Sequence, residues 1–190
     1  MPKFKIGVFG SSAGEEIEQA LEKTTKLGGE LGKRQCIVIT GACSGLPYVA
    51  AAAARKNGAE VWGYSPCSNL EGQKQFTPND DLSIYAKIQY VPESFEFTKD
   101  DLVSKKYRNV LSTASCDAGI IISGRWGTLH EFCSLYDYGK VIGVLTGTGG
   151  VADELPSLMK KISKVSKAKV IFNDSPKELA RLIINELEKL

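Results

Sequence analysis

The sequence has almost no excess of charge of either sign. Its 190 residues include 24 Lys and Arg against 22 Asp and Glu, which leaves a formal net charge of +2. Proteins that bind nucleic acid by neutralising its phosphates usually carry a stronger basic excess. The charge balance therefore predicts that the chain has no nucleic-acid partner.

Long apolar runs are also missing. No apolar stretch approaches the roughly 18 residues that a helix needs to span a bilayer. Met1, Pro2 and Lys3 lead directly into a run typical of a strand, without the pattern of a signal peptide. We therefore expect a cytoplasmic protein with no targeting segment and no membrane partner.

The cysteines form no pattern that would hold a metal ion or a disulfide framework. Their number is odd, and no two of them stand in a C-x-x-C spacing. They are Cys36, Cys43, Cys67, Cys116 and Cys133. Reduced thiols of a cytosolic protein are the better interpretation. We expect neither a bound metal nor a resident cofactor.

What the sequence does contain is a regular alternation of two patterns. Short apolar, β-rich runs predict strands at 3–9, 36–40, 60–64, 88–91, 118–123, 141–145 and 169–172. Amphipathic runs between them predict helices at 15–33, 47–57, 98–115, 128–138, 151–164 and 176–189. This order favours one α/β domain over residues 1–190, a three-layer Rossmann-like sandwich with a doubly wound, mostly parallel sheet of about seven strands. The segment 66–86 is predicted to be irregular, and at that length functional.

Four predicted strand-to-helix turns are rich in Gly, Ser and Thr. They are 10–14, 41–45, 124–128 and 146–150. In a parallel sheet such turns share the carboxyl edge, where glycine lets the backbone approach a ligand and helix N-termini attract anions. Plain tight turns are the alternative. None of the turns matches a P-loop or a full G-x-G-x-x-G motif. We expect a small phosphate-bearing ligand, most simply a nucleotide, at this edge.

Two runs resemble the LOG family, a group once taken for lysine decarboxylases. They are 8–14 and 123–131, and the second is similar to the family pattern P-G-G-x-G-T-x-x-E. Ser123 stands in place of the proline, Arg125 in place of the second glycine, and Asn109 in place of a lysine that follows the family arginine. The resemblance covers about residues 4–145. It implies a Rossmann-like homodimer that hydrolyses nucleoside 5′-monophosphates to free base and ribose 5-phosphate. Relatives in the same superfamily bind ligands without catalysis, among them carriers of the molybdenum cofactor.

The resemblance also implies which residues form the site. Arg108 and Glu131 correspond to the catalytic pair, with Glu131 stabilising an oxocarbenium-like ribose or orienting water. The residues expected to hold the ligand and its phosphate are Gly10, Ser11, Ser12, Gly41, Gly45, Gly124, Arg125, Gly127 and Thr128. The alternatives are structural: Thr128 and Glu131 also fit a helix capping box, and Arg108 also fits a surface arginine.

For several other residues the sequence predicts a structural or interface role. His130, the only histidine, is interpreted as a surface or interface residue, and Asp117 as structural, because it opens a strand at the far edge. Trp126 is expected either to stack on a base or to close a dimer contact. The apolar residues of the 128–138 helix exceed one buried face and favour a homodimer: Leu129, Phe132, Leu135 and Tyr136.

Three functions remain open from the sequence. The chain is a nucleoside 5′-monophosphate phosphoribohydrolase, a non-catalytic carrier or sensor of a nucleotide or of the pterin molybdenum cofactor, or a structural dimer with a vestigial site. The first requires Arg108 and Glu131 to converge on one ribose phosphate. Arg125 and Ser123 favour the second, because they depart from the pattern that the resemblance implies for catalysis.

Overall fold

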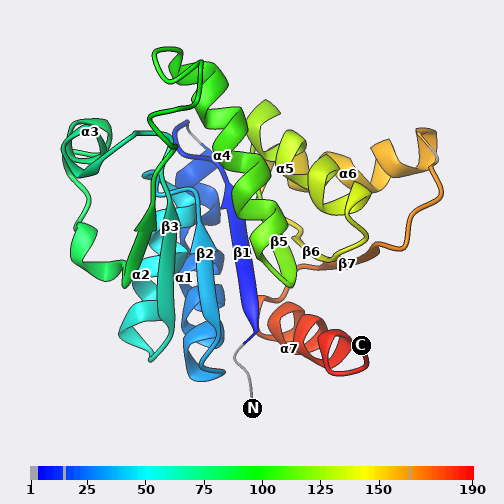
Figure 1. Cartoon of the computed structure of the whole chain (residues 1–190). Coiled ribbons are helices and arrows are strands. Elements are labelled where there is room, and N and C mark those ends of the chain that lie inside the picture. Colours follow the sequence, from blue (N-terminus) through cyan, green and yellow to red (C-terminus); the bar gives the residue numbers. More distant parts are fainter. Residues whose placement is uncertain (1–3, 15, 163) are drawn as a thin grey trace.

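A computed structural model describes residues 4–14, 16–162 and 164–190 (Figure 1). Its centre is a seven-stranded parallel sheet in the order β4-β3-β2-β1-β5-β6-β7. The strands are β1 (Lys5–Gly10), β2 (Ile37–Thr40), β3 (Glu60–Tyr64), β4 (Lys87–Gln89), β5 (Ala118–Ile122), β6 (Val141–Leu145) and β7 (Lys169–Asn173). The predicted α/β fold is confirmed. The central strands β5 and β6 are buried on both faces, which explains their continuous apolar sequences.

Helices cover both faces of the sheet (Figure 1). They are α1 (Glu16–Lys33), α2 (Leu46–Lys56), α3 (Leu70–Phe76), α4 (Asp101–Ser115), α5 (Trp126–Asp137), α6 (Gly150–Lys161) and α7 (Pro176–Leu187). Helices α1, α2 and α7 bury their apolar residues in one core cluster against the sheet. Helices α5 and α6 bury theirs in a second cluster on the opposite face, where α4 packs beside α5. Two cores separated by one sheet make the three layers.

The strand order reverses direction at β1, and this positions the site. From β1 the chain builds β2, β3 and β4 on one side, whereas β5, β6 and β7 follow on the other. Gly10 and Ile122, the last residues of β1 and β5, are register partners, so both strands end at the same level. The turns that follow them diverge to opposite faces of the sheet. A crevice at such a switch point is where open α/β sheets bind ligands.

The segment 66–86 is more ordered than the sequence predicts. It contains helix α3 and a 3₁₀ turn, Leu82–Ile84, so the expectation of an irregular stretch is wrong. Asn69 caps α3 by accepting from the Gly72 amide at 3.0 Å, and Asp81 caps the 3₁₀ turn by accepting from the Ser83 amide at 2.9 Å. Both caps are local hydrogen bonds, and the helices that they start are short. Helices of this length have no long periodic pattern by which the sequence could reveal them.

Two helix starts differ by two or more residues from the sequence prediction. Helix α4 begins at Asp101, where the Asp100 side chain accepts from the amides of Leu102 and Val103. Helix α5 begins at Trp126, two residues before the predicted start, and its N-cap residue Arg125 makes no side-chain capping bond. The capping-box alternative for Thr128 and Glu131 is therefore wrong, because Thr128 already lies inside the helix. This leaves the side chain of Glu131 free of a capping role.

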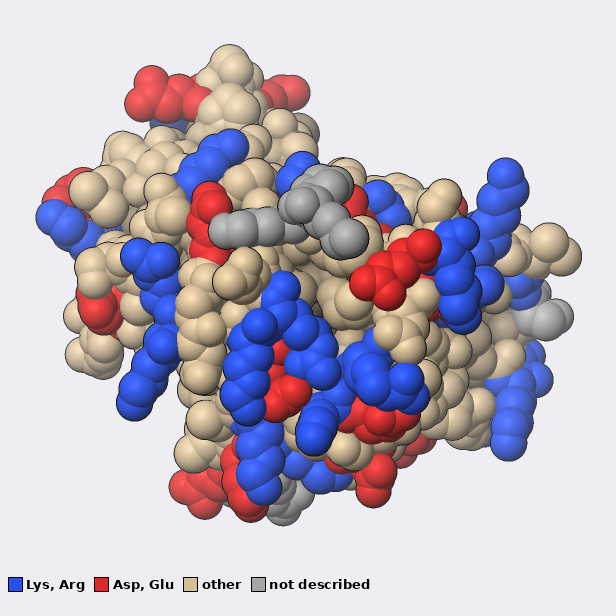
Figure 2. Space-filling model, turned by 90° about the horizontal axis from the view of Figure 1, so that it is seen from below, with Lys and Arg blue, Asp and Glu red and all other residues tan. Residues whose placement is uncertain are grey.

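The edge of the sheet at the amino ends of the strands, opposite the crevice, is rich in basic residues. Figure 2 shows Lys and Arg side chains gathered on the face seen from below, with Asp and Glu between them. Helix α1 ends on Lys33 and helix α2 on Arg55 and Lys56, where cations stabilise the negative end of the helix dipole. Among the described residues, no helix is both long and apolar enough to cross a membrane.

Candidate functional site

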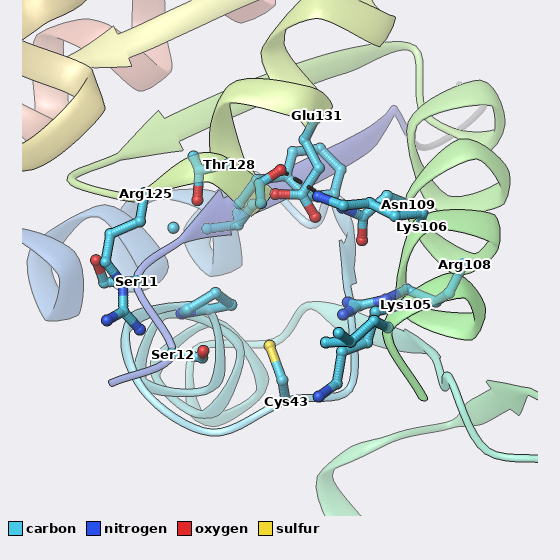
Figure 3. A pocket seen from close by; sticks show the side chains of 17 residues that line it. Ser11, Ser12, Cys43, Lys105, Lys106, Arg108, Asn109, Arg125, Thr128 and Glu131 are labelled. Atoms are coloured by element: carbon cyan, nitrogen blue, oxygen red, sulfur yellow. Dashed lines mark hydrogen bonds between the residues drawn. The ribbon is translucent and has the colours of Figure 1, made fainter. Parts of the chain in front are cut away.

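A cavity of about 350 Å³ lies at the carboxyl edge, in the crevice between β1 and β5 (Figure 3). The turns after β1, β2 and β5 and one face of α4 form its walls. Most of the residues predicted from the sequence line it: Gly10, Ser11, Ser12, Gly41, Arg108, Arg125, Gly127, Thr128 and Glu131. The structure thus brings together segments that lie more than a hundred residues apart.

Gly45 and Gly124 were predicted to hold the ligand, but they do not line the cavity. They shape it instead. Gly124 has φ +101°, and a Cβ there would lie 2.5 Å from the Thr128 side chain. Gly45 has φ +84°, and a Cβ there would lie 2.5 Å from the Ser11 carbonyl oxygen. The Gly124 amide also donates to Ser11 Oγ at 3.1 Å. Both glycines let the three turns pack closely enough to form one concave surface.

The N-terminus of α5 offers the cavity a place for an anion. The first α5 amide to bond within the helix is that of Leu129, which donates to the Arg125 carbonyl at 2.9 Å. The amides of Gly127 and Thr128 precede it and have no carbonyl partner within the helix. A Cβ on Gly127 would meet no atom within 4 Å, so space is open beside these amides. Free amides at a positive helix end are a favourable phosphate site.

The fourth glycine-rich turn, 146–150, does not take part in the cavity. The amides of Gly147 and Gly149 donate to the Asp153 carboxylate at 2.7 and 2.8 Å. An internal carboxylate therefore occupies the position that an anion would take. Thr148 Oγ1 accepts from the Ser123 amide at 2.9 Å, which supports Ser123 at φ +50°. This turn stabilises the β5–α5 turn rather than binding ligand.

Arg108 is buried, which rules out the surface-arginine alternative. Only 7% of the residue is exposed, and its guanidinium lies against the backbone of Gly41. A Cβ on Gly41 would fall 1.1 Å from Arg108 Nη1, so only glycine leaves this space. Within the described residues, Arg108 Nε has no hydrogen-bond partner. Because Arg108 also lines the cavity, its guanidinium can offer the strong, bidentate hydrogen bonds that this group forms with phosphates and carboxylates.

Glu131 enters the same cavity from α5 (Figure 3). The residue is 7% exposed, and burial raises the pKa of its carboxyl group to about 7, against the opposing positive charges of Arg108 and Lys106. A carboxyl group with a pKa near neutrality can exchange a proton during a reaction at physiological pH. Its environment is typical of a functional carboxylate rather than of a surface one.

Sequence reasoning missed several residues of the cavity wall on α4. Lys105, Lys106 and Asn109 line it, and Asn109 follows the two lysines by four and three residues, the spacings that bring helix side chains side by side. Asn109 Nδ2 donates to the Gly127 carbonyl at 3.4 Å, while its buried Oδ1 has no partner in the described part of the chain. The polar periodicity of 105, 106 and 109 beside Arg108 was the signal that could have revealed this face.

The cavity is electropositive. Its lining includes four cationic side chains against the single carboxylate of Glu131: Lys105, Lys106, Arg108 and Arg125. Cys43 also lines the wall, and burial raises the pKa of its thiol despite the nearby charge of Arg108. The thiol is therefore protonated at neutral pH. The charge balance suits a phosphate-bearing ligand. No three His, Cys, Asp or Glu side chains cluster as a metal site among the residues that the structure describes.

The remaining sequence candidates lie outside the cavity. Asp117 opens β5 at the far edge, where its carboxylate accepts from the Lys5 amide at 2.8 Å, a structural role. His130 is half-buried, and burial lowers the pKa of its imidazole. Trp126 is 83% exposed at the start of α5. Of the apolar α5 residues that favoured a homodimer, Phe132 and Leu135 are buried in the core of this chain, so they are not surplus.

The chain is similar to proteins of known structure. The SLOG cluster4 family model matches residues 3–180. No curated protein sequence matches the chain. The X-ray structure of TM1055, a structural-genomics target, has a TM-score of 0.78 and 20% identity, and the match covers 96% of this chain and 99% of that one.

Two further structures have stated ligands. The molybdenum cofactor binding protein from the phototrophic bacterium Rippkaea orientalis has a TM-score of 0.69 and 18% identity, over 98% of this chain and 99% of that chain. DNA processing protein A from Helicobacter pylori, which binds single-stranded DNA, has a TM-score of 0.62 and 19% identity, over 96% and 81%. The fold is thus shared with a nucleic-acid binder, which weakens the prediction that the chain has no nucleic-acid partner.

These matches agree with the motifs of the sequence and with the geometry of the site. The Rossmann-type fold is shared, and the family match extends over nearly the whole chain. The resemblance to LOG proteins is thereby confirmed at the level of a LOG-like fold. The chain belongs to the SLOG cluster4 family.

Proposed function

We propose that the chain binds a nucleoside 5′-monophosphate and hydrolyses its N-glycosidic bond to free base and ribose 5-phosphate. The observation that carries the proposal is Glu131, a buried carboxyl group with a pKa of about 7 that shares one cavity with Arg108 and with the amides of Gly127 and Thr128. An anion site, a cation and a proton-exchanging carboxylate are the parts that this reaction requires.

In this proposal each part has a role. The phosphate binds the free amides of Gly127 and Thr128 and the Thr128 hydroxyl, and Arg108 supplies a charged donor from the opposite wall. Water attacks the anomeric carbon of the ribose while the bond to the base nitrogen breaks, and that electron pair leaves with the base. Glu131 in its ionised form stabilises the positive charge that builds on the ribose and accepts the proton of the attacking water, and this proton then passes to the departing nitrogen, so that the base leaves neutral.

One observation favours a second candidate, binding without hydrolysis. Arg125 is the N-cap residue of α5 and lines the cavity, where the LOG pattern has a glycine. Its long cationic side chain enlarges the anion site and suits a ligand with more negative charge than one phosphate. A structural neighbour binds the molybdenum cofactor, which fits this role of carrier or sensor.

A direct assay separates the two candidates. The wild-type protein is incubated with a panel of nucleoside 5′-monophosphates, ribose 5-phosphate is measured, and binding of the same panel is followed by calorimetry. Release of ribose 5-phosphate supports the hydrolase. Binding without release replaces it with the carrier or sensor, and absence of both release and binding contradicts the nucleotide site itself.

Thr128→Ala is expected to weaken nucleotide binding by about 1–2 kcal/mol, because a hydroxyl that donates to a charged acceptor contributes roughly that amount. Thr128 is buried at the cavity wall, so its hydroxyl has little access to compensating solvent. Calorimetry on Thr128→Ala and Thr128→Ser checks this, since serine keeps the hydroxyl. Equal weakening by both variants would show that the methyl group, which packs against Gly124, is the relevant part.

The homodimer remains a prediction. Leu129 and Tyr136 are partly buried and line an apolar groove of about 250 Å³ with Leu158, Met159 and Ile162, between α5 and α6. We expect a dimeric mass by light scattering at micromolar concentration. A monomeric mass would leave this groove without the proposed partner copy.

A further inference from the structure

A second cavity adjoins the site and has no role in the mechanism above. It measures about 250 Å³ and is lined by Ser12, Cys43, Ser44, Phe76, Thr77, Lys105 and Arg108. Four of these residues also line the first cavity: Ser12, Cys43, Lys105 and Arg108. Figure 3 shows Cys43 and Arg108 facing one another at the side of the first cavity away from Thr128. The two spaces are therefore neighbours with a common wall, and the second lies on the side of Arg108 away from Thr128.

Hydrogen bonds between segments distant in the sequence hold the walls of the second cavity in place. Gln73, fully buried on α3, donates through Nε2 to the Ala42 carbonyl at 3.0 Å and to Thr77 Oγ1 at 2.8 Å. Ser44 Oγ donates to Asp80 Oδ2 at 2.8 Å. These bonds fasten α3 and the chain after it to the β2–α2 turn. The segment 66–86 thus forms a preformed wall against the site.

The chemistry of this wall suits a planar aromatic group. Phe76 is half-buried and lines the cavity, and Lys105 Nζ lies 5.3 Å from the centroid of its ring. The Phe76 ring offers an aromatic surface on which a base can stack, and Lys105, which lies over that ring, adds a cation that can also contact the π-face of a base. At the junction of the two cavities, Arg108 carries a buried Nε with no partner in the described residues. The guanidinium of Arg108 is a wall that both cavities share.

We propose that this second cavity is the base-binding subsite of the ligand and that Phe76 is its stacking residue. The inference rests on the proposed nucleotide site and deepens it. The phosphate lies at the N-terminus of α5, the ribose lies between Glu131 and Arg108, and the base enters the space under α3. A mononucleotide would then span both cavities, and the segment 66–86 would select the base.

The test compares nucleotides with ribose 5-phosphate, which lacks the base. Affinities for AMP, GMP, CMP and ribose 5-phosphate are measured by calorimetry on the wild type, Phe76→Ala and Phe76→Leu, with Phe97→Ala as a control. Phe97 is 49% exposed and lines neither cavity. Both Phe76 variants are expected to weaken binding of at least one nucleotide by about 5- to 100-fold, the usual contribution of stacking, and to leave ribose 5-phosphate unchanged. Phe76→Leu keeps the apolar volume if the alanine variant does not fold.

Each result decides a different claim. Equal affinity of the wild type for ribose 5-phosphate and for all nucleotides would overturn the base subsite and leave the phosphate site intact. So would wild-type nucleotide affinity in both Phe76 variants. Failure of the wild type to bind any of the four compounds would overturn the proposed function together with the subsite.

Discussion

Glu131→Gln is expected to abolish release of ribose 5-phosphate from nucleoside monophosphates while leaving the fold intact. The amide keeps the size of the side chain but cannot ionise, so it neither stabilises an oxocarbenium-like ribose nor accepts a proton. Loss of such a role commonly costs about 10²–10⁴-fold in rate. The rate is measured under single-turnover conditions, with the protein in excess over the nucleotide and at a saturating concentration. Glu154→Gln, an exposed carboxylate on α6, is the matched control and is expected to turn over at the wild-type rate.

The same variant is expected to be more stable than the wild type at high pH. In the folded protein burial raises the pKa of Glu131 to about 7 from an ordinary 4.5, so between these values the folded state binds more protons than the unfolded state. Its contribution to stability is full below pH 4.5 and is lost as the pH rises through 7. Ionisation thus destabilises the wild type by up to about 3 kcal/mol above pH 8, and glutamine escapes this cost.

Denaturant unfolding at pH 5 and at pH 8 measures this effect. The free energies of unfolding of wild type and Glu131→Gln are expected to be similar at pH 5 and to diverge in favour of the variant at pH 8. The wild-type rate is expected to rise with pH through 7, because the ionised carboxylate is the active form. A variant less stable than wild type at both pH values would point to a structural role, and unchanged turnover would contradict the catalytic one.

Gly41→Ala is expected to reproduce the loss of binding caused by Arg108→Ala. The added Cβ would stand 1.1 Å from Arg108 Nη1, so the buried guanidinium has to leave its position although no charged group is removed. Loss of a charge-assisted contact to the ligand phosphate weakens nucleotide binding by about 10- to 100-fold. Calorimetry on the two variants, followed by their combination, measures this. Because both act on one guanidinium, the double variant is expected to bind no more weakly than either single variant.

Gly29→Ala is the matched control for this substitution. A Cβ on Gly29 in α1 would have its nearest contact at 3.6 Å, an ordinary van der Waals distance, to Asn57 Nδ2. We expect unchanged nucleotide affinity and a gain of about 0.5–1 kcal/mol in stability from the interior helix position. Wild-type affinity in Gly41→Ala would show that Arg108 reaches the ligand from another rotamer.

Local patterns in the sequence were sufficient to predict the parallel sheet and most of the cavity wall. Continuous apolar runs such as those of β5 and β6 identify strands buried on both faces, and the order of strands and helices limits the topology. Glycine-rich turns after β1, β2 and β5 then share one edge, because parallel strands all end there. Glu131 and Thr128 could be predicted as site residues from the LOG motif together with the fact that parallel strands end at one edge.

Where the site depends on contacts distant in the sequence, local patterns were insufficient or misleading. Thr128 and Glu131 have capping-box spacing, yet α5 begins at Trp126, because the preceding turn is fixed by Ser11 and Thr148 rather than by a capping side chain. The fourth glycine-rich turn has the composition of an anion site, and Asp153 from its own helix fills it.

The sequence by itself determined the alternation of strands and helices, and it placed Arg108, Arg125 and Glu131 at the carboxyl edge of the sheet. Only the tertiary structure decided that Arg108 is buried against Gly41, that α3 closes a second cavity over Cys43, and that Glu131 has a pKa near 7. The reason is physical. Secondary structure follows from the periodicity of neighbouring residues, whereas burial, free donors and shifted pKa values arise from groups that meet only after the chain has folded.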